Sequence, residues 1–273
     1  MITKEEASRL IRIGRDFMHM PEEDPEYNSD QYSDVPAPPL FKDPVSDVII
    51  DLPMDFDSLK ADTPLLDIVN RRSSHRVYTE EYISLLQLSY LLWCAQGVKG
   101  KRGKNYCTLR TVPCGGSRHE FDVYFAVQYV EGLKPGYYHY LPEHHQIEFL
   151  GEESDIRSFI DESVAKQTWA VKASVVFYFD MVAYRAEWRY GIYTHRVALM
   201  DLGYISENIY LASEVLGLGS CALGSISEGI ANEKFGLDGS EEFILLAHPV
   251  GTIKEADRQK ELDFYAFVHD YDK

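Results

Sequence analysis

Three short apolar segments follow one another closely in the middle of the chain, and residues that favour turns separate them. The segments are residues 122–130, 137–140 and 146–150, and the turns contain Gly132, Pro135-Gly136 and Pro142-Glu143-His144-His145. Short runs rich in β-branched and aromatic residues, bounded by glycine and proline, are typical of β-strands joined by hairpins. The pattern therefore predicts an antiparallel meander, and any fold proposed for this chain must contain it.

Segments with helical periodicity lie on both sides of this meander. Ser84 begins an apolar segment that ends at Gly97, which indicates a buried helix with a glycine stop. Apolar residues also recur at helical spacing over residues 196–216 and predict a long helix. The sequence further predicts a helix over residues 153–166, strands over 173–180 and 242–250, and a last short apolar run over 261–269.

The first 62 residues differ from the rest of the chain. Thr3-Lys4-Glu5-Glu6 has the pattern of a capping box and predicts an amphipathic helix to about Met18 instead of a signal peptide. Residues 21–62 are rich in proline, aspartate and serine, and we expect them to form an extended arm over the surface. The sequence thus predicts an N-terminal helix and arm over 1–62 and a folded domain over 63–273.

The charge balance limits the class of partner. The chain carries 44 acidic and 27 basic side chains, a formal net charge of −17. Binding to nucleic acid or to an anionic membrane is not expected, and no apolar run is long enough to span a bilayer. The sequence therefore predicts a small-molecule partner. We also expect reduced thiols and a cytoplasmic location, because the four cysteines have no paired spacing: Cys94, Cys107, Cys114 and Cys221.

Three further patterns favour ordinary structure over a binding site. Residues 99–104 are rich in lysine and glycine but lack the Lys-Ser/Thr pair of a nucleotide loop, so we expect a solvated loop. The series Gly217-x-Gly219…Gly224 follows a helix instead of a strand, which disfavours an NAD-binding Rossmann fold. We predict no metal site, because the three closely spaced histidines fall on a predicted turn: His139, His144 and His145.

Positive charge is concentrated just after a short helix predicted over residues 63–70, with Thr63 as its N-cap. The cluster consists of Arg71, Arg72, Ser73, Ser74 and Arg76. Guanidinium groups form forked bonds to phosphate oxygens, and serine hydroxyls supply further donors, so the cluster has the composition of a phosphate site. Arginines at a helix C-terminus can also simply compensate the helix dipole. Both interpretations stay open on these residues alone.

Four segments share their order and separations with one known family. They are Arg72-x-Ser74-x-Arg76-x-Tyr78, the loop from Arg110 to His119, the loop from Leu216 to Ser225, and Arg258-x-Lys260 after Gly251. Together they resemble the FMN-dependent nitroreductase family, and in particular its branch of SagB-type dehydrogenases, over residues 63–260.

The resemblance implies a role for each segment. Arg72, Ser74 and Arg76 would hold the phosphate and ribityl chain of FMN, with Arg71 and Ser73 beside them. The second loop would pass along the flavin ring, where successive glycines let the backbone come close. Leu223 and Gly224 would donate backbone N–H groups to flavin N5, and Arg258 and Lys260 would complete the phosphate site. The flavin-ring loop consists of Pro113, Cys114, Gly115, Gly116, Ser117 and Arg118.

Some residues in these segments have a second interpretation. Cys114 stands where serine is usual in the branch, and it could equally be a buried packing cysteine. Arg118 could stabilise negative charge on the reduced flavin, or Arg118 and His119 could be structural anchors.

The resemblance also implies a fold and a chemistry. The fold would be α+β, with a central, mainly antiparallel sheet flanked by helices, in a homodimer that exchanges the C-terminal run 262–268. FMN would lie between the protomers and exchange hydride at N5 in a ping-pong cycle. The expected activity is NAD(P)H-dependent reduction of nitro- or quinone-type small molecules.

One pair of residues departs from the branch and leaves other functions open. Azoline oxidases of the branch carry Lys-Tyr before a glycine, whereas this chain has Arg189-Tyr190-Gly191. Arginine stays protonated and cannot act as the general base that a buried lysine can become. Tyr190 could donate a proton or orient substrate, or the pair could pack at the dimer interface. The alternatives to a reductase are an azoline dehydrogenase reoxidised by O2 and a non-catalytic flavin-binding scaffold.

Overall fold

The predicted meander is present and pairs as expected. The structure, a computed structural model, describes residues 2–19, 21 and 26–257. Each strand of the meander is antiparallel to the next, and the strands are β4 (Phe121–Val127), β5 (Gly136–Leu141) and β6 (Gln146–Glu152). The short turns between them leave no room for a parallel arrangement, so this part of the prediction is confirmed.

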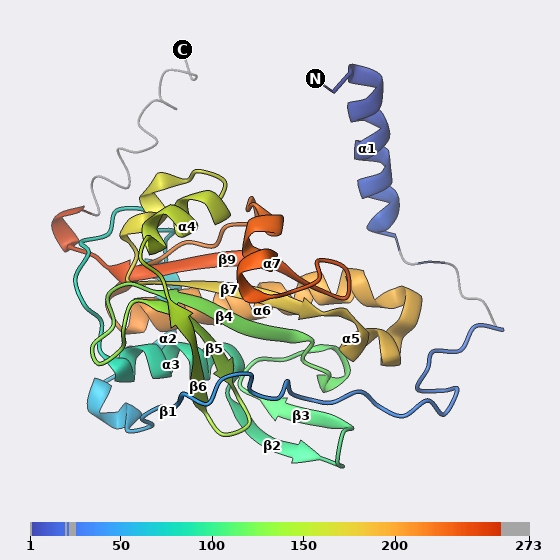
Figure 1. The fold of residues 1–273 in the computed structure, drawn as a ribbon, viewed down its shortest axis with the longest axis horizontal. Coiled ribbons are helices and arrows are strands. Elements are labelled where there is room, and N and C mark those ends of the chain that lie inside the picture. Colours follow the sequence, from blue (N-terminus) through green and yellow to red (C-terminus); the bar gives the residue numbers. More distant parts are fainter. Residues whose placement is uncertain (1, 20, 22–25, 258–273) are drawn as a thin grey trace.

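The meander belongs to a seven-stranded sheet in which all neighbouring strands are antiparallel. Its order is β1-β6-β5-β4-β7-β9-β8, with β4 at the centre (Figure 1). The other strands are β1 (Ile49–Asp51), β7 (Val175–Val182), β8 (Leu218–Ser220) and β9 (Glu242–Thr252). Helices cover the sheet on both faces. The predicted α+β class with an antiparallel sheet is therefore confirmed.

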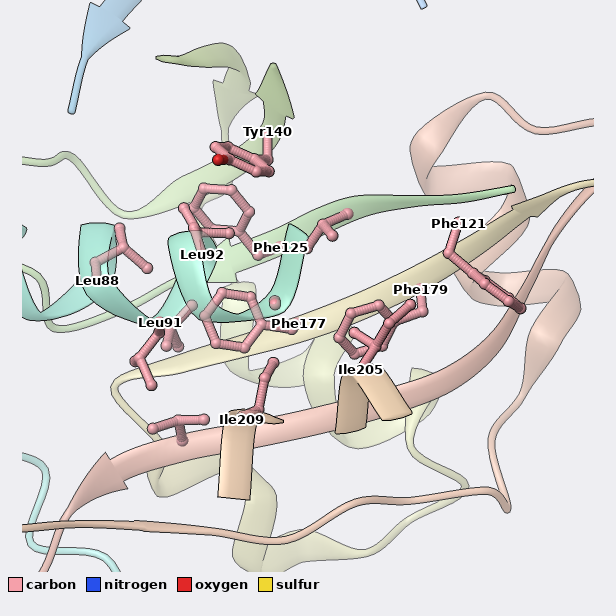
Figure 2. Packing of buried hydrophobic residues seen from close by; sticks show 14 of the residues in the cluster. Leu88, Leu91, Leu92, Phe121, Phe125, Tyr140, Phe177, Phe179, Ile205 and Ile209 are labelled. Atoms are coloured by element: carbon pink, nitrogen blue, oxygen red, sulfur yellow. The ribbon is translucent and has the colours of Figure 1, made fainter. Parts of the chain in front are cut away.

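One face of the sheet packs against two helices, α3 (Leu85–Gln96) and α6 (Thr194–Val215). Alternate residues of β4 and β7 point toward these helices, as the period of a strand requires. Figure 2 shows the rings of β4 and β7 between leucines of α3 and isoleucines of α6. The residues that meet there are Leu88, Leu91, Leu92, Phe121, Phe125, Phe177, Phe179, Ile205 and Ile209.

The opposite face packs against α4 (Ile156–Ser163) and α7 (Glu228–Phe235). Here the intervening strand residues are aromatic: the Tyr124 ring stacks on Phe235 with centroids 5.0 Å apart, and Tyr178 lies 5.3 Å from the same ring. Because both faces are covered, all seven residues of β4 are buried. A strand buried on both sides is apolar along its length, and β4 follows this pattern except at Asp122, which is paired with Arg185.

Sequence signals set the ends of α3. Ser84 caps the N-terminus by accepting a hydrogen bond from the Gln87 N–H at 3.1 Å, while the Gln87 side chain accepts from the Ser84 N–H at 2.8 Å. This reciprocal pair is a capping box. At the other end, a Cβ on Gly97 would overlap the Trp93 ring, so only glycine fits. The predicted start and stop of this helix are confirmed.

The N-terminal helix and arm are also present. Helix α1 (Lys4–Phe17) begins as predicted, with the Thr3 hydroxyl accepting from the Glu6 N–H, and it stands away from the rest of the protein (Figure 1). From residue 26 onward the arm runs over the surface of the domain. Lys42 fastens it to the sheet, since its Nζ lies 2.7 Å from Asp180 and 2.8 Å from Glu242. No helix among the described residues is long and apolar enough to cross a membrane.

Two local predictions were wrong. Residues 99–104 are not a loop: they lie in a hairpin of β2 (Val98–Arg102) and β3 (Cys107–Arg110), and the charged residues within 99–104 are exposed. Helix α2 (Leu65–Arg71) is capped by Pro64 and not by Thr63. A helix does not use the N–H at its N-cap, so proline is tolerated there, and the helix begins one residue later than predicted.

The predicted solvated histidine turn was also wrong, because two of its three histidines are buried. His139 Nδ1 lies 2.7 Å from Glu148 Oε1. His145 bonds Ser89 at 2.7 Å and Tyr140 at 2.8 Å, and burial lowers its pKa to about 4. Only His144 is exposed. These histidines are packing groups of the sheet rather than metal ligands.

The sequence missed the short helix α5 (Ala183–Tyr190), which leads directly to the pair Arg189-Tyr190. Three of the predicted features lie outside the described residues: Arg258, Lys260 and the C-terminal run 262–268. Their predicted roles stay predictions.

Candidate functional site

The arginine-serine cluster lies beside the edge strand β8. Residue Ser74 pairs with Ser220 in a parallel bridge, and the His75 N–H donates to the Ser220 carbonyl at 2.9 Å. A Cβ on Gly219 would overlap His75, so the two segments can approach this closely only because residue 219 is glycine. The structure thus brings together two segments that the sequence separates by almost 150 residues and that the resemblance places on one cofactor.

Tyr210 of α6 connects these segments. Its hydroxyl lies 3.2 Å from Ser74 Oγ and accepts from the Ala222 N–H at 2.8 Å. The Arg72 guanidinium lies 5.3 Å from the centre of the same ring, within the range of a cation–π contact. Sequence analysis missed Tyr210, because within the long helix it looks like any other aromatic residue.

The members of the cluster differ in how far their charges are already satisfied. Arg71 Nε lies 3.0 Å from Glu214 Oε1, so this guanidinium has a carboxylate partner. Arg72 has no carboxylate within ion-pair distance among residues 26–257. Arg76 lies over the Trp169 ring at 5.8 Å, and Ser73 Oγ lies 3.0 Å from His75 Nε2. Arg72 is therefore the arginine best placed to meet an external anion.

The loop after β8 contains Leu223 and Gly224, whose backbone N–H groups were both predicted to donate to the flavin. Only one of the two N–H groups is available. The Leu223 N–H already donates to the Ala247 carbonyl at 2.8 Å, so it is not available to a cofactor. The prediction for Leu223 is corrected accordingly. Gly224 is exposed, and its N–H has no acceptor within the part of the chain that the structure describes. Of the two predicted donors, only the Gly224 N–H is left without an acceptor there.

The predicted flavin-ring loop has an unusual backbone. Gly116, Ser117 and His119 all have φ values near +50° to +57°, a region that non-glycine residues rarely adopt. The Gly115 N–H donates to Asp201 Oδ2 of α6 at 2.9 Å, which holds the loop against the long helix. Backbone strain of this kind is found mainly where surrounding contacts enforce it at functional sites.

Arg118 is a structural anchor, which was one of its two predicted roles. The side chain is fully buried, and its guanidinium donates to the carbonyls of Arg185, Asn105 and Tyr106. It also lies 4.8 Å from the centre of the Trp188 ring. A guanidinium enclosed in this way cannot reach a flavin ring, so the alternative of a flavin contact is corrected. Burial and neighbouring arginines lower the pKa of His119 to about 2, so its imidazole is neutral.

The pair Arg189-Tyr190 lies directly on this loop. A Cβ on Gly116 would overlap the Arg189 side chain and come within 2.8 Å of the Tyr190 hydroxyl oxygen. On its other side Arg189 donates to the Tyr106 hydroxyl at 3.1 Å, and this bond lowers the pKa of Tyr106. Both predicted catalytic residues therefore lie against the predicted flavin-ring loop, residues 113–118, which is called the glycine loop below.

Three proton-binding groups meet beneath the loop. Ligand atoms of Cys114, Glu120 and Asp201 lie within 4.8 Å of one another, and Cys114 Sγ is 3.2 Å from Glu120 Oε2. Burial, and then the charge of Asp201, raise the pKa of Glu120 to about 7, and burial also raises the pKa values of Asp201 and Cys114. Burial thus favours the protonated form of each group in this cluster. Cys114 is thus a partly buried thiol with a raised pKa, which agrees with packing instead of a redox role.

Replacing Glu120 with glutamine is expected to flatten the pH dependence of stability. Between its ordinary pKa of 4.5 and its folded pKa of about 7, the wild-type carboxyl keeps its proton only when folded. The wild type therefore loses stability as the pH rises through this window, by about 1–3 kcal/mol. Urea unfolding at a series of pH values would measure the slope. The exposed variant Glu131→Gln should leave the slope unchanged, and an equal slope for Glu120→Gln would contradict the assignment.

The two groups of site residues lie on opposite sides of α6. Asp201 supports the glycine loop, and Tyr210 supports the arginine-serine cluster nine positions later. Nine residues correspond to about two and a half helical turns, so the two side chains point in opposite directions about 14 Å apart along the axis. One protomer thus presents the two halves of the predicted cofactor site on different sides of its central helix.

Comparisons with known proteins identify the family of this chain. A model of the nitroreductase family matches residues 68–252, which include the arginine-serine cluster, the glycine loop and the loop after β8. A protein described as nitroreductase MJ1384 of Methanocaldococcus jannaschii is 30% identical over 187 residues, covering 68% of this chain and 90% of its own length.

Two other proteins are similar over different lengths. The trifolitoxin-processing protein TfxB of Rhizobium leguminosarum bv. trifolii is 30% identical over 133 residues, 47% of this chain but only 36% of its own length. A solved structure described as a nitroreductase of Ralstonia eutropha JMP134 superimposes with a TM-score of 0.60 at 25% identity, covering 81% of this chain and 96% of that one. The chain belongs to the nitroreductase family, and it is an oxidoreductase of that family.

Proposed function

We propose that this enzyme is an FMN-dependent oxidoreductase that takes hydride from NADH or NADPH and delivers it to small nitro- or quinone-type molecules. The observation that carries the proposal is the Arg72 guanidinium, which lacks a carboxylate partner among the described residues although the chain has a net charge of −17. Ser74 and Tyr210 add hydroxyl groups to the same place. A guanidinium without a carboxylate partner, with hydroxyl groups beside it, is suited to binding a phosphate.

The residues present fit FMN at three points. Arg72, Ser74 and Arg76 would hold its phosphate, and the Gly224 N–H would donate to its ring. The ring would lie along the glycine loop, where Arg189 and Tyr190 pack directly against Gly116. When bound, FMN supplies the exchange of hydride between donor and acceptor.

The side chains near the glycine loop would act on the substrate. The Tyr190 hydroxyl lies where it can hold or donate a proton, next to Gly116. Arg189 keeps its charge, because its bond to Tyr106 raises its pKa still further above neutrality. It would therefore orient an electron-rich substrate and not remove a proton from it.

We further propose that the site is completed in a homodimer. The arginine-serine cluster and the glycine loop lie on opposite sides of α6, so a single protomer does not present them to one ligand. The exposed side of α6 carries Leu199, Met200 and Tyr204, which are 45%, 45% and 47% exposed. Large apolar side chains gathered on a helix surface mark an association surface. A twofold axis beside α6 would bring the cluster of one protomer toward the loop of its partner.

The test is an anaerobic titration of the FMN-loaded protein with NADH and then with NADPH. Flavin absorbance should bleach with at least one of them, and addition of a nitroaromatic should restore it. Absence of bleaching with both nicotinamides would overturn the reductase proposal. The same experiment in air measures how far O2 competes as an acceptor.

A second candidate function is oxidation of azoline rings in a peptide, with reoxidation by O2. Similarity to the trifolitoxin-processing protein favours it, although the match covers 36% of that protein. Arg189 disfavours it, because a protonated guanidinium cannot remove the ring proton. Bleaching of the flavin by a thiazoline-containing peptide, but not by either nicotinamide, would establish this function in place of the first. Membership of a family of oxidoreductases disfavours the non-catalytic alternative.

A further inference from the structure

A pocket opens next to the pair Arg189-Tyr190, and the arm forms half of its wall. Its volume is about 240 Å³, and it is lined by Tyr27, Ser29, Tyr32, Arg189, Tyr190 and Tyr193. Sites for drug-sized ligands are usually about 300–1,000 Å³. The space thus suits a single ring with its substituents.

The arm is fixed in place over this pocket by bonds to α5 and to the turn after it. The Gln31 N–H donates to the Trp188 carbonyl at 2.8 Å, and Trp188 Nε1 donates to the Val35 carbonyl at 2.7 Å. Tyr27 accepts from the Ile192 N–H at 3.1 Å. Its hydroxyl occupies the space that a side chain on residue 191 would fill, so glycine is required there. The pocket is therefore a built feature of the folded protein.

Two polar residues line the pocket: a buried serine without a hydrogen-bond partner and an arginine without a carboxylate partner among the described residues. Ser29 is 7% exposed, and its hydroxyl has no hydrogen-bond partner among the described residues. A buried hydroxyl without a partner is unfavourable by about 1–3 kcal/mol, so a ligand that satisfies it gains affinity. Arg189 interacts with the hydroxyls of Tyr106 and Tyr190, and no carboxylate of the described residues pairs with it. Both residues line the pocket that an acceptor would enter.

The remaining wall is aromatic. Tyr27 and Tyr193 meet edge to face, with centroids 6.1 Å apart, and Tyr32 is 76% exposed at the rim. Tyrosines provide flat apolar surface for a ring while keeping their hydroxyls in water. The pocket thus combines a surface for an aromatic ring with two donors for a negatively charged group.

We propose that this tyrosine pocket binds the acceptor substrate, and that it selects a single aromatic ring that carries a carboxylate or similar anionic group. Arg189 binds the anion, the Ser29 hydroxyl donates a second hydrogen bond to it, and Tyr27, Tyr32 and Tyr193 surround the ring. Tyr190 lines the pocket, and its hydroxyl lies against Gly116, so a ligand held here lies beside the predicted flavin-ring loop. The proposal deepens the proposed function and rests on it for the chemistry that follows binding.

The experiment compares 4-nitrobenzoate with 4-nitrobenzyl alcohol, which has the same ring without the charge. The wild type should have a KM at least about tenfold lower for the carboxylate, and Ser29→Ala should raise that KM about tenfold with little change in kcat. Arg189→Gln should remove the preference for the anion. The matched control is Ser33→Ala, at an exposed position of the same arm. Equal KM values for the two compounds, or no effect of Ser29→Ala, would overturn the proposal.

Benzoate, which cannot be reduced, separates this proposal from the proposed function. Calorimetric titration of the FMN-loaded protein should show benzoate binding that weakens about tenfold in Ser29→Ala and is retained in Ser33→Ala. Thermal melting of each variant establishes that it is folded. Binding of benzoate without reduction of either nitro compound would support the pocket and overturn the reductase. Reduction of both nitro compounds without benzoate binding would overturn the pocket and leave the reductase standing.

Discussion

Alanine at both Arg72 and Arg76 is expected to lower the affinity for FMN by two to four orders of magnitude. Each charge-assisted phosphate contact contributes about 1.5–3 kcal/mol, so the loss of two amounts to about 3–6 kcal/mol. The effect should be large because Arg72 has no carboxylate partner within the described chain and its charge is free for the cofactor. Flavin content after dialysis, and fluorescence titration of the stripped protein with FMN, would measure it.

Arg71→Ala is the matched control for this prediction. Its guanidinium is paired with Glu214 at 3.0 Å, so its removal should change FMN affinity much less than the loss of Arg72 and Arg76 together. Unchanged flavin retention in the double variant would place the phosphate site elsewhere. An equal loss in Arg71→Ala would show that all three arginines act on the cofactor.

Mixed dimers would test whether the site is shared. One protomer would carry the double alanine change, and the other would carry Gly116→Val, which places a side chain where the loop approaches Arg189 and Tyr190. If each site takes its cluster from one protomer and its loop from the other, a mixed dimer contains one intact site and one doubly damaged site. It should bind one FMN, while neither parent dimer binds any. A mixed dimer without flavin would contradict the shared site.

Asp122→Ala is expected to lower the free energy of unfolding by about 3–5 kcal/mol, the largest effect on stability that we predict. Asp122 and Arg185 form a forked ion pair at 2.8 and 3.0 Å, and both side chains are 2% exposed. Although burial alone would raise the pKa of Asp122, Arg185 lowers it overall. Removal of the carboxylate leaves a buried guanidinium without its counter-ion. Urea unfolding of the wild type and the variant would measure the change.

The control for this prediction is an ion pair of the same types at the surface. Glu80 pairs with Arg157, and these side chains are 36% and 47% exposed. Glu80→Ala should lower the free energy of unfolding by about 0–1 kcal/mol, because water replaces the lost partner. A similar small effect for Asp122→Ala would mean that water reaches Arg185 in the folded protein.

The elements that could be predicted from the sequence are those whose local pattern and tertiary surroundings agree. The meander and the helix that begins at Ser84 carry turn and capping signals that act within a few residues. Helix α5 was missed because it has only eight residues and mixes charged with aromatic side chains. The β2–β3 hairpin was missed because its strands are charged and form a separate two-stranded sheet, so they lack the apolar pattern of a buried strand.

The candidate site was predictable where neighbouring residues form it and not where distant segments meet. The spacing Arg72-x-Ser74-x-Arg76 could be recognised in the sequence, and the structure places it against β8. The contributions of Tyr210 and Asp201 depend on which side of α6 each residue faces. The prediction that Leu223 donates failed because its N–H is used by a contact with Ala247, a residue of another strand.

The arm that covers α5 contributes to the pocket from outside the part of the chain that matches the family. Its residues Tyr27, Ser29 and Tyr32 precede the part of the chain that matches the family, residues 68–252, yet they form half of the pocket. If this pocket binds the acceptor as proposed, mutations in the arm change substrate preference without changing the residues proposed to hold the flavin. Replacement of the arm, in evolution or by design, would therefore change the substrate specificity of the enzyme while its redox chemistry stays the same.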